Sequence, residues 1–193
     1  MLDPVGSLLA RRGVVVLDGG MATELERRGA DLHDPLWSAR VLLDRPELVR
    51  EVHRSYFEAG ADVAISASYQ ASFEGLERRG LDPDAAAAVL RRSVELAAQA
   101  RDEVERRPDG ERRLIAASIG PYGAVLANGA EYTGDYGKDV DELERWHRPR
   151  MEVLAASGAD LLAIETIPSV VEAEALARAL GSLPETPAWI SFS

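Results

Sequence analysis

The stretch Val14-Val-Val-Leu-Asp-Gly-Gly20 ends an apolar run with one acid and two glycines. Four β-favouring residues in a row predict a strand over 14–18 that is buried on both faces. Asp18 then stands at the carboxyl end of that strand, where parallel α/β folds bind their ligands. Gly19 and Gly20 allow a small molecule to approach the backbone closely. The alternative is a plain strand-to-helix turn in which Asp18 caps the next helix.

The rest of the chain alternates between strand-like and helix-like patterns. Short apolar runs predict four further strands, at 62–69, 114–119, 160–166 and 188–193. Apolar residues at helical spacing predict four helices, at 46–59, 85–107, 139–157 and 169–180. Asp84 is expected to cap the second of these helices, and Pro149 is expected to interrupt or kink the third.

This alternation predicts the α/β fold class with a parallel sheet. Five strands and four helices make up about five-eighths of a (β/α)8 TIM barrel, which typically has about 250 residues. The chain is therefore either an open five-stranded sheet or the N-terminal part, 1–193, of a single barrel domain. Two insertions, 31–44 and 121–138, follow the first and third strands on their carboxyl side, and the second is predicted to be a long loop without helix.

Composition argues against several classes of function. The chain has 22 basic and 33 acidic residues, a formal charge of −11, and no basic patch, which argues against a nucleic-acid partner. No segment approaches the roughly 18 apolar residues of a membrane helix, and segment 1–12 orders its charged and apolar residues wrongly for a secretory signal. A cytoplasmic protein without a membrane partner is expected. With no cysteine, and three histidines that lack metal-ligand spacing, no metal ligand is predicted in the chain.

Polar residues follow the predicted strands at the ends where ligands bind. Asp18 and Glu165 are the two acids among them, and together they suit either a cationic group such as an α-ammonium or general acid–base chemistry. Taken alone, Glu165 is equally explained as a helix cap or a satisfied core acid. Ser68 and Gln70 are further predicted substrate-binding residues, although the segment around Gln70 also fits a turn. The other strand-end residues are Ser66, Tyr69, Ser118, Gly120 and Thr166.

Aromatic and imidazole side chains away from the strand ends are open to two interpretations. Tyr122, Tyr132 and Tyr136 lie in the 121–138 insertion, where they either hold a sulfonium or ammonium cation or pack the loop onto the fold. His53 and His147 lie on predicted helices, which favours surface or interhelical roles over catalysis. No residue is predicted as catalytic.

Ordered motifs across nearly the whole chain resemble the homocysteine S-methyltransferase family. A single one of these motifs would be weak, whereas all of them in the family's order are specific. The segment 66–72 resembles the branch that uses S-methylmethionine or S-adenosylmethionine rather than betaine. The motifs are 18–29 (DGGMATELERRG), 36–40 (LWSAR), 53–62 (HRSYFEAGAD), 66–72 (SASYQAS), 120–124 (GPYGA), 131–136 (EYTGDY), 147–150 (HRPR) and 163–168 (AIETIP).

The resemblance implies a zinc-dependent (β/α)8 barrel that transfers a methyl group from a sulfonium donor to homocysteine and so forms methionine. It implies that Asp18 and Glu165 hold the homocysteine amino group and that Gly19 and Gly20 line the homocysteine site. Zinc in this family binds the homocysteine thiol and keeps it as a thiolate. The family's three zinc-binding cysteines, one on the sixth strand and a pair near the end of the barrel, have no counterpart up to Ser193.

Two hypotheses of different classes remain. The first is the N-terminal part of a homocysteine S-methyltransferase, weakly active or inactive as it stands, with homocysteine and a sulfonium methyl donor as partners. The second is a non-catalytic barrel fragment that acts by binding, or that self-associates through open strand edges as a homo-oligomer. A metal-independent lyase or aldolase is disfavoured, because the only lysine, Lys138, lies in a predicted loop.

Overall fold

The computed structural model describes residues 3–33, 37–105, 110–126 and 128–193, in which helices and strands alternate. The strands are β1 (Val63–Ile65), β2 (Leu114–Ile119), β3 (Leu161–Ile167) and β4 (Ala188–Phe192). Within the described ranges, no helix combines the length and the apolar character needed to cross a bilayer. The helices are α1 (Pro4–Arg12), α2 (Met21–Arg27), α3 (Trp37–Asp44), α4 (Pro46–Glu58), α5 (Phe73–Glu77), α6 (Pro83–Glu103), α7 (Tyr122–Leu126), the 3-10 turn η1 (Ala130–Tyr132), α8 (Val140–Ala155) and α9 (Val170–Gly181).

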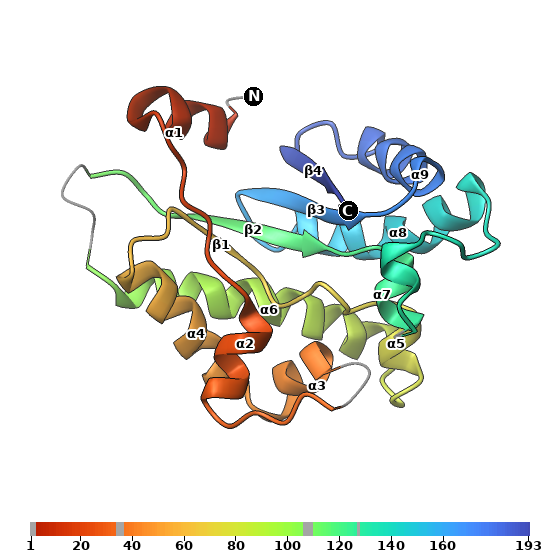
Figure 1. Ribbon diagram of the computed structural model, residues 1–193, viewed down its shortest axis with the longest axis horizontal. Helices are drawn as coiled ribbons and strands as arrows, with labels where there is room; N and C mark the ends of the chain where they lie inside the picture. Colours follow the sequence, from red (N-terminus) through yellow and green to blue (C-terminus); the bar gives the residue numbers. More distant parts are fainter. Residues whose placement is uncertain (1–2, 34–36, 106–109, 127) are drawn as a thin grey trace.

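The four strands form one parallel sheet in the order β1-β2-β3-β4 (Figure 1). Each strand reaches the next through helices, as parallel pairing requires. Helices α4, α6, α8 and α9 follow one another across one face of the sheet. The predicted α/β class with a parallel sheet is therefore confirmed. Three of the predicted strands lie within two residues of their expected bounds, whereas the one predicted at 62–69 is shortened to β1.

The two faces of the sheet carry different side chains because residues alternate along a strand. Ile115, Ala117 and Leu162 point toward α6, α8 and α9 in the largest core cluster. Ala116 and Ala163 point to the opposite face, where α1 packs on the sheet through Leu8. Figure 1 shows α1 on the other side of the sheet from α4 and α6. Small residues on this face leave space toward the carboxyl ends of the strands. By the same alternation, Ser118 and Glu165 stand on this face, one step closer to those ends.

The predicted first strand, 14–18, is not a strand in the structure. Its only ladder contact in the described chain is an isolated parallel bridge between Leu17 and Val63. The Asp62 carboxylate accepts the Val16 N–H at 2.8 Å, so a side chain takes the place of a neighbouring strand's carbonyl. Val14, Val16 and Leu17 are 58%, 46% and 46% exposed. The prediction that this segment is buried on both faces was therefore also wrong. The segment forms an open edge of the sheet beside β1.

Several helix boundaries differ from expectation for local reasons. Asp82, not Asp84, caps α6: its carboxylate accepts the Ala85 N–H at 2.8 Å, and Pro83 occupies the first helical position, which proline favours. Pro149 lies inside α8 without ending it, because buried residues on both sides of it anchor the helix to the core. The predicted end of the long helix at 106–107 lies outside the described residues. The insertions 31–44 and 121–138 contain α3, and α7 with η1, so the second is not free of helix.

The start of α8 provides a stability prediction. Asp139 and Glu142 form a reciprocal capping box: the Asp139 carboxylate accepts the Glu142 N–H at 2.8 Å, and the Glu142 carboxylate accepts the Asp139 N–H at 3.0 Å. Removing an N-cap acid costs about 1 kcal/mol. We expect Asp139→Ala to lower the free energy of unfolding in urea by about that amount. Asp135→Ala, in the exposed loop before the helix, is the control, and equal losses in both variants would contradict the capping role.

Candidate functional site

A cavity of about 440 Å³ opens at the carboxyl ends of the strands, on the face of the sheet that carries Ser118 and Glu165. Its walls come from four separate parts of the chain: the turn before α2, the end of β1, the end of β2 and the end of β3. The volume lies within the range of small-molecule sites. The lining residues are Asp18, Gly19, Gly20, Met21, Ala22, Ile65, Ser66, Ala67, Tyr69, Ser118 and Glu165.

Asp18 is held by the neighbouring strand and not by the helix that follows it. Its backbone N–H donates to the Val63 carbonyl at 3.0 Å, and its Oδ2 accepts the Ile65 N–H at 2.9 Å. The N-cap of α2 is Gly20, which has no side chain to cap with. The alternative in which Asp18 caps the next helix is therefore excluded. Only 3% of the Asp18 side chain is exposed, at the cavity wall.

Glu165 enters the same cavity from β3. Its Oε1 accepts a short hydrogen bond from the Ser118 hydroxyl on β2. The next residue, Thr166, has φ +60°, a backbone conformation that is rare for a β-branched residue. The pairing of β3 with β4 shifts register between Ile164 and Ile167, around the same point. Such irregularities commonly occur next to functional sites, where they redirect side chains.

Two glycines bring aromatic rings close to the backbone around the cavity. A Cβ on Gly19 would lie 2.8 Å from the Tyr56 hydroxyl, which itself donates to the Gly20 carbonyl at 3.2 Å. A Cβ on Gly120 would lie 2.6 Å from the Tyr69 carbonyl and 2.7 Å from its ring. Any larger residue at either position would displace these rings. Gly19 and Gly120 are therefore needed for close packing.

Burial makes both carboxyl groups resist ionisation. It raises the pKa of Asp18 to about 7, with a further increase from the negative charge of Glu165 and an opposing effect from the Ile65 N–H. Burial also raises the pKa of Glu165, against the effect of the Ser118 hydroxyl. A cation placed between the two carboxylates would lower both pKa values again, because it favours the charged forms. The cavity therefore has the electrostatics of a site for a small cationic group.

The raised pKa of Asp18 predicts a pH-dependent cost to stability. The folded state retains a proton on Asp18 that the unfolded state has already lost above pH 4, so this group weakens the fold as pH rises from about 4 to about 7. Asp18→Asn removes the effect, and the amide oxygen can still accept the Ile65 N–H. We expect the variant to gain stability over the wild type across this window, by up to about 4 kcal/mol at pH 7 and above.

Urea unfolding of both proteins at several pH values between 4 and 8 measures this difference. The buried His53 and His147, whose pKa values burial lowers to about 4, act in the opposite direction over the same range. They are present in both proteins, so the comparison isolates Asp18. A difference in stability that does not change with pH would contradict the prediction.

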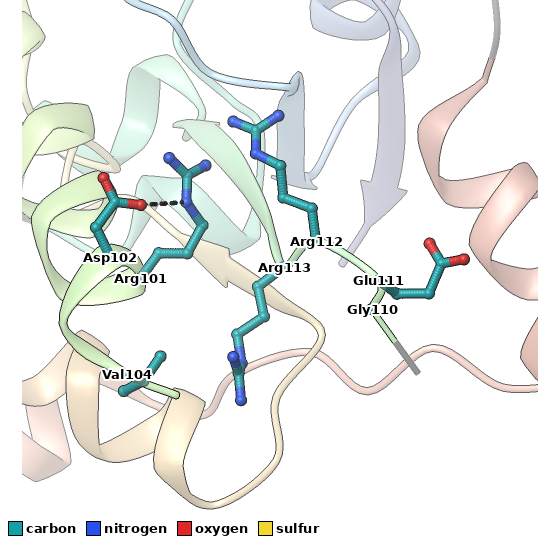
Figure 2. A pocket seen from close by; sticks show the side chains of 7 residues that line it. All are labelled: Arg101, Asp102, Val104, Gly110, Glu111, Arg112 and Arg113. Carbon is teal, nitrogen blue, oxygen red and sulfur yellow. Dashed lines mark hydrogen bonds and ion pairs between the residues drawn. The ribbon is translucent and has the colours of Figure 1, made fainter. Parts of the chain in front are cut away.

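A second, larger cavity of about 510 Å³ lies at the opposite end of the sheet, between the end of α6 and the start of β2. Figure 2 shows that Arg113 points away from Arg101 and Arg112, so the guanidinium groups do not converge. Arg101 bonds Asp102 at 3.1 Å, and Arg112 bonds Asp160 at 2.7 Å. Two of its three guanidinium groups are thus already paired with carboxylates, and this cavity is a weaker candidate than the one at the strand ends.

Comparison with known proteins agrees with the geometry of the strand-end cavity. The family model described as homocysteine S-methyltransferase matches residues 15–193, which include every residue that lines this cavity. The chain belongs to the homocysteine S-methyltransferase family. It is 53% identical to the homocysteine S-methyltransferase YbgG of Bacillus subtilis and 50% identical to the homocysteine S-methyltransferase of Escherichia coli. It is also 47% identical to a selenocysteine Se-methyltransferase of Brassica oleracea.

Solved structures of this family have the same fold. Crystal structures of the homocysteine methyltransferase MmuM from Escherichia coli superpose with TM-scores of 0.94 for the oxidized form and 0.93 for the metallated form, at 50% and 51% identity. They cover 99% and 98% of this chain. The chain spans 66% of each of those chains, and 62% of the Bacillus subtilis and Escherichia coli relatives.

The cavity of this homocysteine S-methyltransferase family member brings together four of the six predicted substrate-binding residues: Asp18, Gly19, Gly20 and Glu165. Ser68 and Gln70 do not line it. The Ser68 hydroxyl is buried and donates to the Ser118 carbonyl at 2.8 Å, and the Gln70 amide reaches the Ala124 carbonyl at 3.5 Å. Ser66, Tyr69 and Ser118 line the cavity and were among the strand-end residues. The apolar lining residues Met21, Ala22, Ile65 and Ala67 were not predicted as binding residues, although all but Ile65 lie within the motifs at 18–29 and 66–72.

Two of the three tyrosines of segment 121–138, Tyr122 and Tyr136, pack the fold. Tyr122 is buried and meets the rings of Tyr136 and Trp146 edge to face, at 5.4 Å and 4.9 Å between ring centroids. Tyr132 is exposed. His147 lies between α8 and α9, with its Nε2 2.9 Å from the carboxylate of Glu172, so the interhelical interpretation is confirmed for this residue. The cavity lining includes neither His147 nor the aromatic side chains of Tyr122, Tyr132, Tyr136 and Trp146.

The residues whose structure is described do not fit a zinc ion. Zinc takes three or four sulfur, nitrogen or carboxylate ligands. The chain has no cysteine, and the described residues contain no group of three His, Asp or Glu side chains that could hold a metal. Asp18 and Glu165 supply two carboxylates to the cavity, with no third ligand of this kind on its lining. No step proposed below passes through a metal.

Proposed function

We propose that the strand-end cavity binds homocysteine through its α-ammonium group, which lies between Asp18 and Glu165. The observation that carries the proposal is that two acids from separate strand ends line one cavity in a member of this family. The cation would favour the ionised form of both carboxyl groups, against the burial that raises each pKa. Gly20 leaves space for the amino-acid end of the ligand, since only the Thr23 side chain would lie within 4 Å of a Cβ at that position, whereas Tyr56 fills the space beside Gly19.

In the proposed reaction this site presents the homocysteine thiol to a sulfonium methyl donor, S-methylmethionine or S-adenosylmethionine. The homocysteine sulfur forms a bond to the methyl carbon while the donor's carbon–sulfur bond breaks and its electron pair stays on the leaving sulfur. Methionine and the demethylated thioether result, and the thiol proton passes to solvent. The residues of this chain contribute by fixing the amino-acid end, which orients the thiol for in-line attack.

We propose further that residues 1–193 are the N-terminal part of a (β/α)8 barrel, weakly active or inactive in methyl transfer as this chain stands. The parallel sheet, the close superposition on Escherichia coli MmuM and the 66% share of that chain support the barrel. The absence of cysteine from the sequence, and of a metal-binding group among the residues that the structure describes, supports low activity. Homocysteine binding needs only the cavity described here, so it is separable from turnover.

Two measurements on the purified chain test the proposed function. Calorimetric titration with L-homocysteine under reducing conditions is expected to show saturable binding at one site. Methionine formation, followed in parallel with S-methylmethionine and with S-adenosylmethionine and with zinc supplied, is expected to stay far below the roughly 10 per second typical of enzymes. An absence of homocysteine binding would overturn the proposed site, and turnover near the typical value would overturn the low activity.

Association through open strand edges is a second candidate function with an observation in its favour. On β4, the side chains of Ile190 and Phe192 are 42% and 63% exposed, and the edge at 14–17 is also apolar and exposed. Unpaired apolar edges favour association with another chain. Sedimentation velocity at micromolar concentration discriminates association from the proposed homocysteine-binding function. A stable oligomer supports association, and a folded monomer that binds homocysteine contradicts it.

A further inference from the structure

His53 lies on α4, directly behind Asp18, and the proposed reaction does not use it. Its side chain is fully buried, and its Nδ1 lies 4.0 Å from Asp18 Oδ2. Neither ring nitrogen has a hydrogen-bond partner within the described part of the chain. Leaving a buried polar group unsatisfied costs about 1–3 kcal/mol. A histidine held this way needs an explanation beyond packing, because an apolar side chain would fill the same space without that cost.

The surroundings of His53 keep it neutral. Burial lowers its pKa to about 4, so the imidazole carries one proton at neutral pH and can place it on either nitrogen. The negative charge of Glu165 on β3 raises the pKa of Asp18, and Asp18 in turn raises the pKa of Tyr56 on α4. Beyond Tyr56 lie Glu24, Arg27 and Arg28 on α2, which act on that tyrosine. His53 is therefore a neutral donor placed beside a carboxyl group whose charge changes with its ligand.

We propose that His53 is a positioning residue that donates its Nδ1–H to Asp18 Oδ2 when a cationic ligand ionises that carboxyl group. This inference rests on the proposed function of the cavity. A closure of about 1 Å turns the 4.0 Å separation into a hydrogen bond, and such bonds at functional sites are often long without ligand. The Ile65 N–H already bonds Oδ2, and a carboxylate oxygen accepts two donors.

The hydrogen bond would act by setting how readily Asp18 becomes charged. A donor to a carboxylate favours its ionised form, so removing the donor raises the pKa of Asp18 further. It would also fix the carboxylate plane, so that the second oxygen faces the cavity. His53 thus acts through Asp18 and does not touch the ligand.

Carbon-13 NMR of aspartate carboxyl groups tests this role without any ligand, with the Asp18 signal assigned from its loss in Asp18→Asn. We expect the pKa of Asp18 to rise by about one pH unit in His53→Leu. His53→Asn should restore it toward the wild-type value, because the asparagine amide nitrogen takes the place of Nδ1. Val52→Ala, a fully buried neighbour on α4, is the matched control and should leave this pKa unchanged. An unchanged pKa of Asp18 in folded His53→Leu would overturn the proposal.

A measurement on the wild-type protein keeps the proposal testable even if His53→Leu does not fold. Nitrogen-15 shifts of the His53 ring report which nitrogen carries the proton. We expect the Nδ1–H form, without titration between pH 5 and 8. An Nε2–H ring would overturn the inference, because it has no proton to give to Asp18.

Homocysteine affinity provides a second, ligand-dependent test. If the pKa of Asp18 moves from about 7 to about 8, His53→Leu should weaken binding about fivefold at pH 7 and about twofold at pH 8. If structural damage alone weakened homocysteine binding, the loss of affinity would be the same at pH 7 and at pH 8. If no variant binds homocysteine while the pKa of Asp18 still responds, the proposed function fails and the His53 role stands. If the wild type binds homocysteine and the pKa of Asp18 is the same in His53→Leu, the proposed role of His53 alone fails.

Discussion

Asp18→Asn is expected to weaken homocysteine binding by about tenfold to a hundredfold while the fold stays intact. The variant keeps an oxygen for the Ile65 N–H but loses the negative charge that faces the ligand ammonium. A hydrogen bond to a charged partner contributes about 1.5–3 kcal/mol, which corresponds to that range in affinity. Glu165→Gln should cause a loss of the same order, since its carboxylate lines the same cavity. Calorimetric titration at pH 8 measures both.

Asp102→Asn is the matched control for these variants. Asp102 is also an acid at a cavity, but at the opposite end of the sheet, where it bonds Arg101 (Figure 2). The affinity of the Asp102→Asn variant for homocysteine should equal that of the wild type. Unchanged affinity in both Asp18→Asn and Glu165→Gln would contradict the role given to the two acids, whatever the control shows.

Glu172→Leu is expected to cause the largest loss of stability among these variants. The carboxylate of Glu172 is fully buried on α9 and accepts three hydrogen bonds: from the Tyr122 N–H at 2.6 Å, the Tyr136 hydroxyl at 3.0 Å and His147 Nε2 at 2.9 Å. Arg150 donates to His147 Nδ1 at 3.0 Å, so the ring must carry its proton on Nε2.

Removing the acid leaves this buried network without its acceptor and its negative charge. Breaking a buried charged network from one side costs about 3–5 kcal/mol. We expect a loss of that size in the free energy of unfolding in urea. Glu174→Leu, two residues along the same helix but half exposed and paired with Arg178, should lose less than about 1 kcal/mol. Similar losses in the two variants would contradict the importance of the buried network.

The regular part of the fold was predictable because its signals are local. The strand at 114–119 is a continuous apolar run between turn residues, and the helix at 46–58 has apolar residues at helical spacing, so both appear where expected. The segment 14–18 has the same apolar signal as a buried strand and still forms only one bridge. The Asp62 carboxylate accepts the Val16 N–H and the Asp62 N–H bonds the Val16 carbonyl at 2.7 Å, and no local pattern reveals these contacts with a residue far along the chain.

The candidate site was predictable only in part, for a related reason. Asp18 and Glu165 were found because acids at the carboxyl ends of parallel strands meet at one edge of the sheet. Ser68 follows the same rule, yet its hydroxyl turns to the Ser118 carbonyl and away from the cavity. The position of His53 behind Asp18 depends on how α4 packs on the sheet. Spacing within the sequence does not encode such contacts between distant elements.

Recognition of an ammonium group by Asp18 and Glu165 is the central claim, and a pair of ligands tests it most directly. 4-Mercaptobutanoate has the carbon chain, thiol and carboxylate of homocysteine but lacks the amino group. We predict that the wild-type chain binds L-homocysteine at least about tenfold more tightly than 4-mercaptobutanoate, and that this preference disappears in Asp18→Asn combined with Glu165→Gln. Equal affinity of the wild type for the two ligands, measured by calorimetry at pH 8, would contradict the claim.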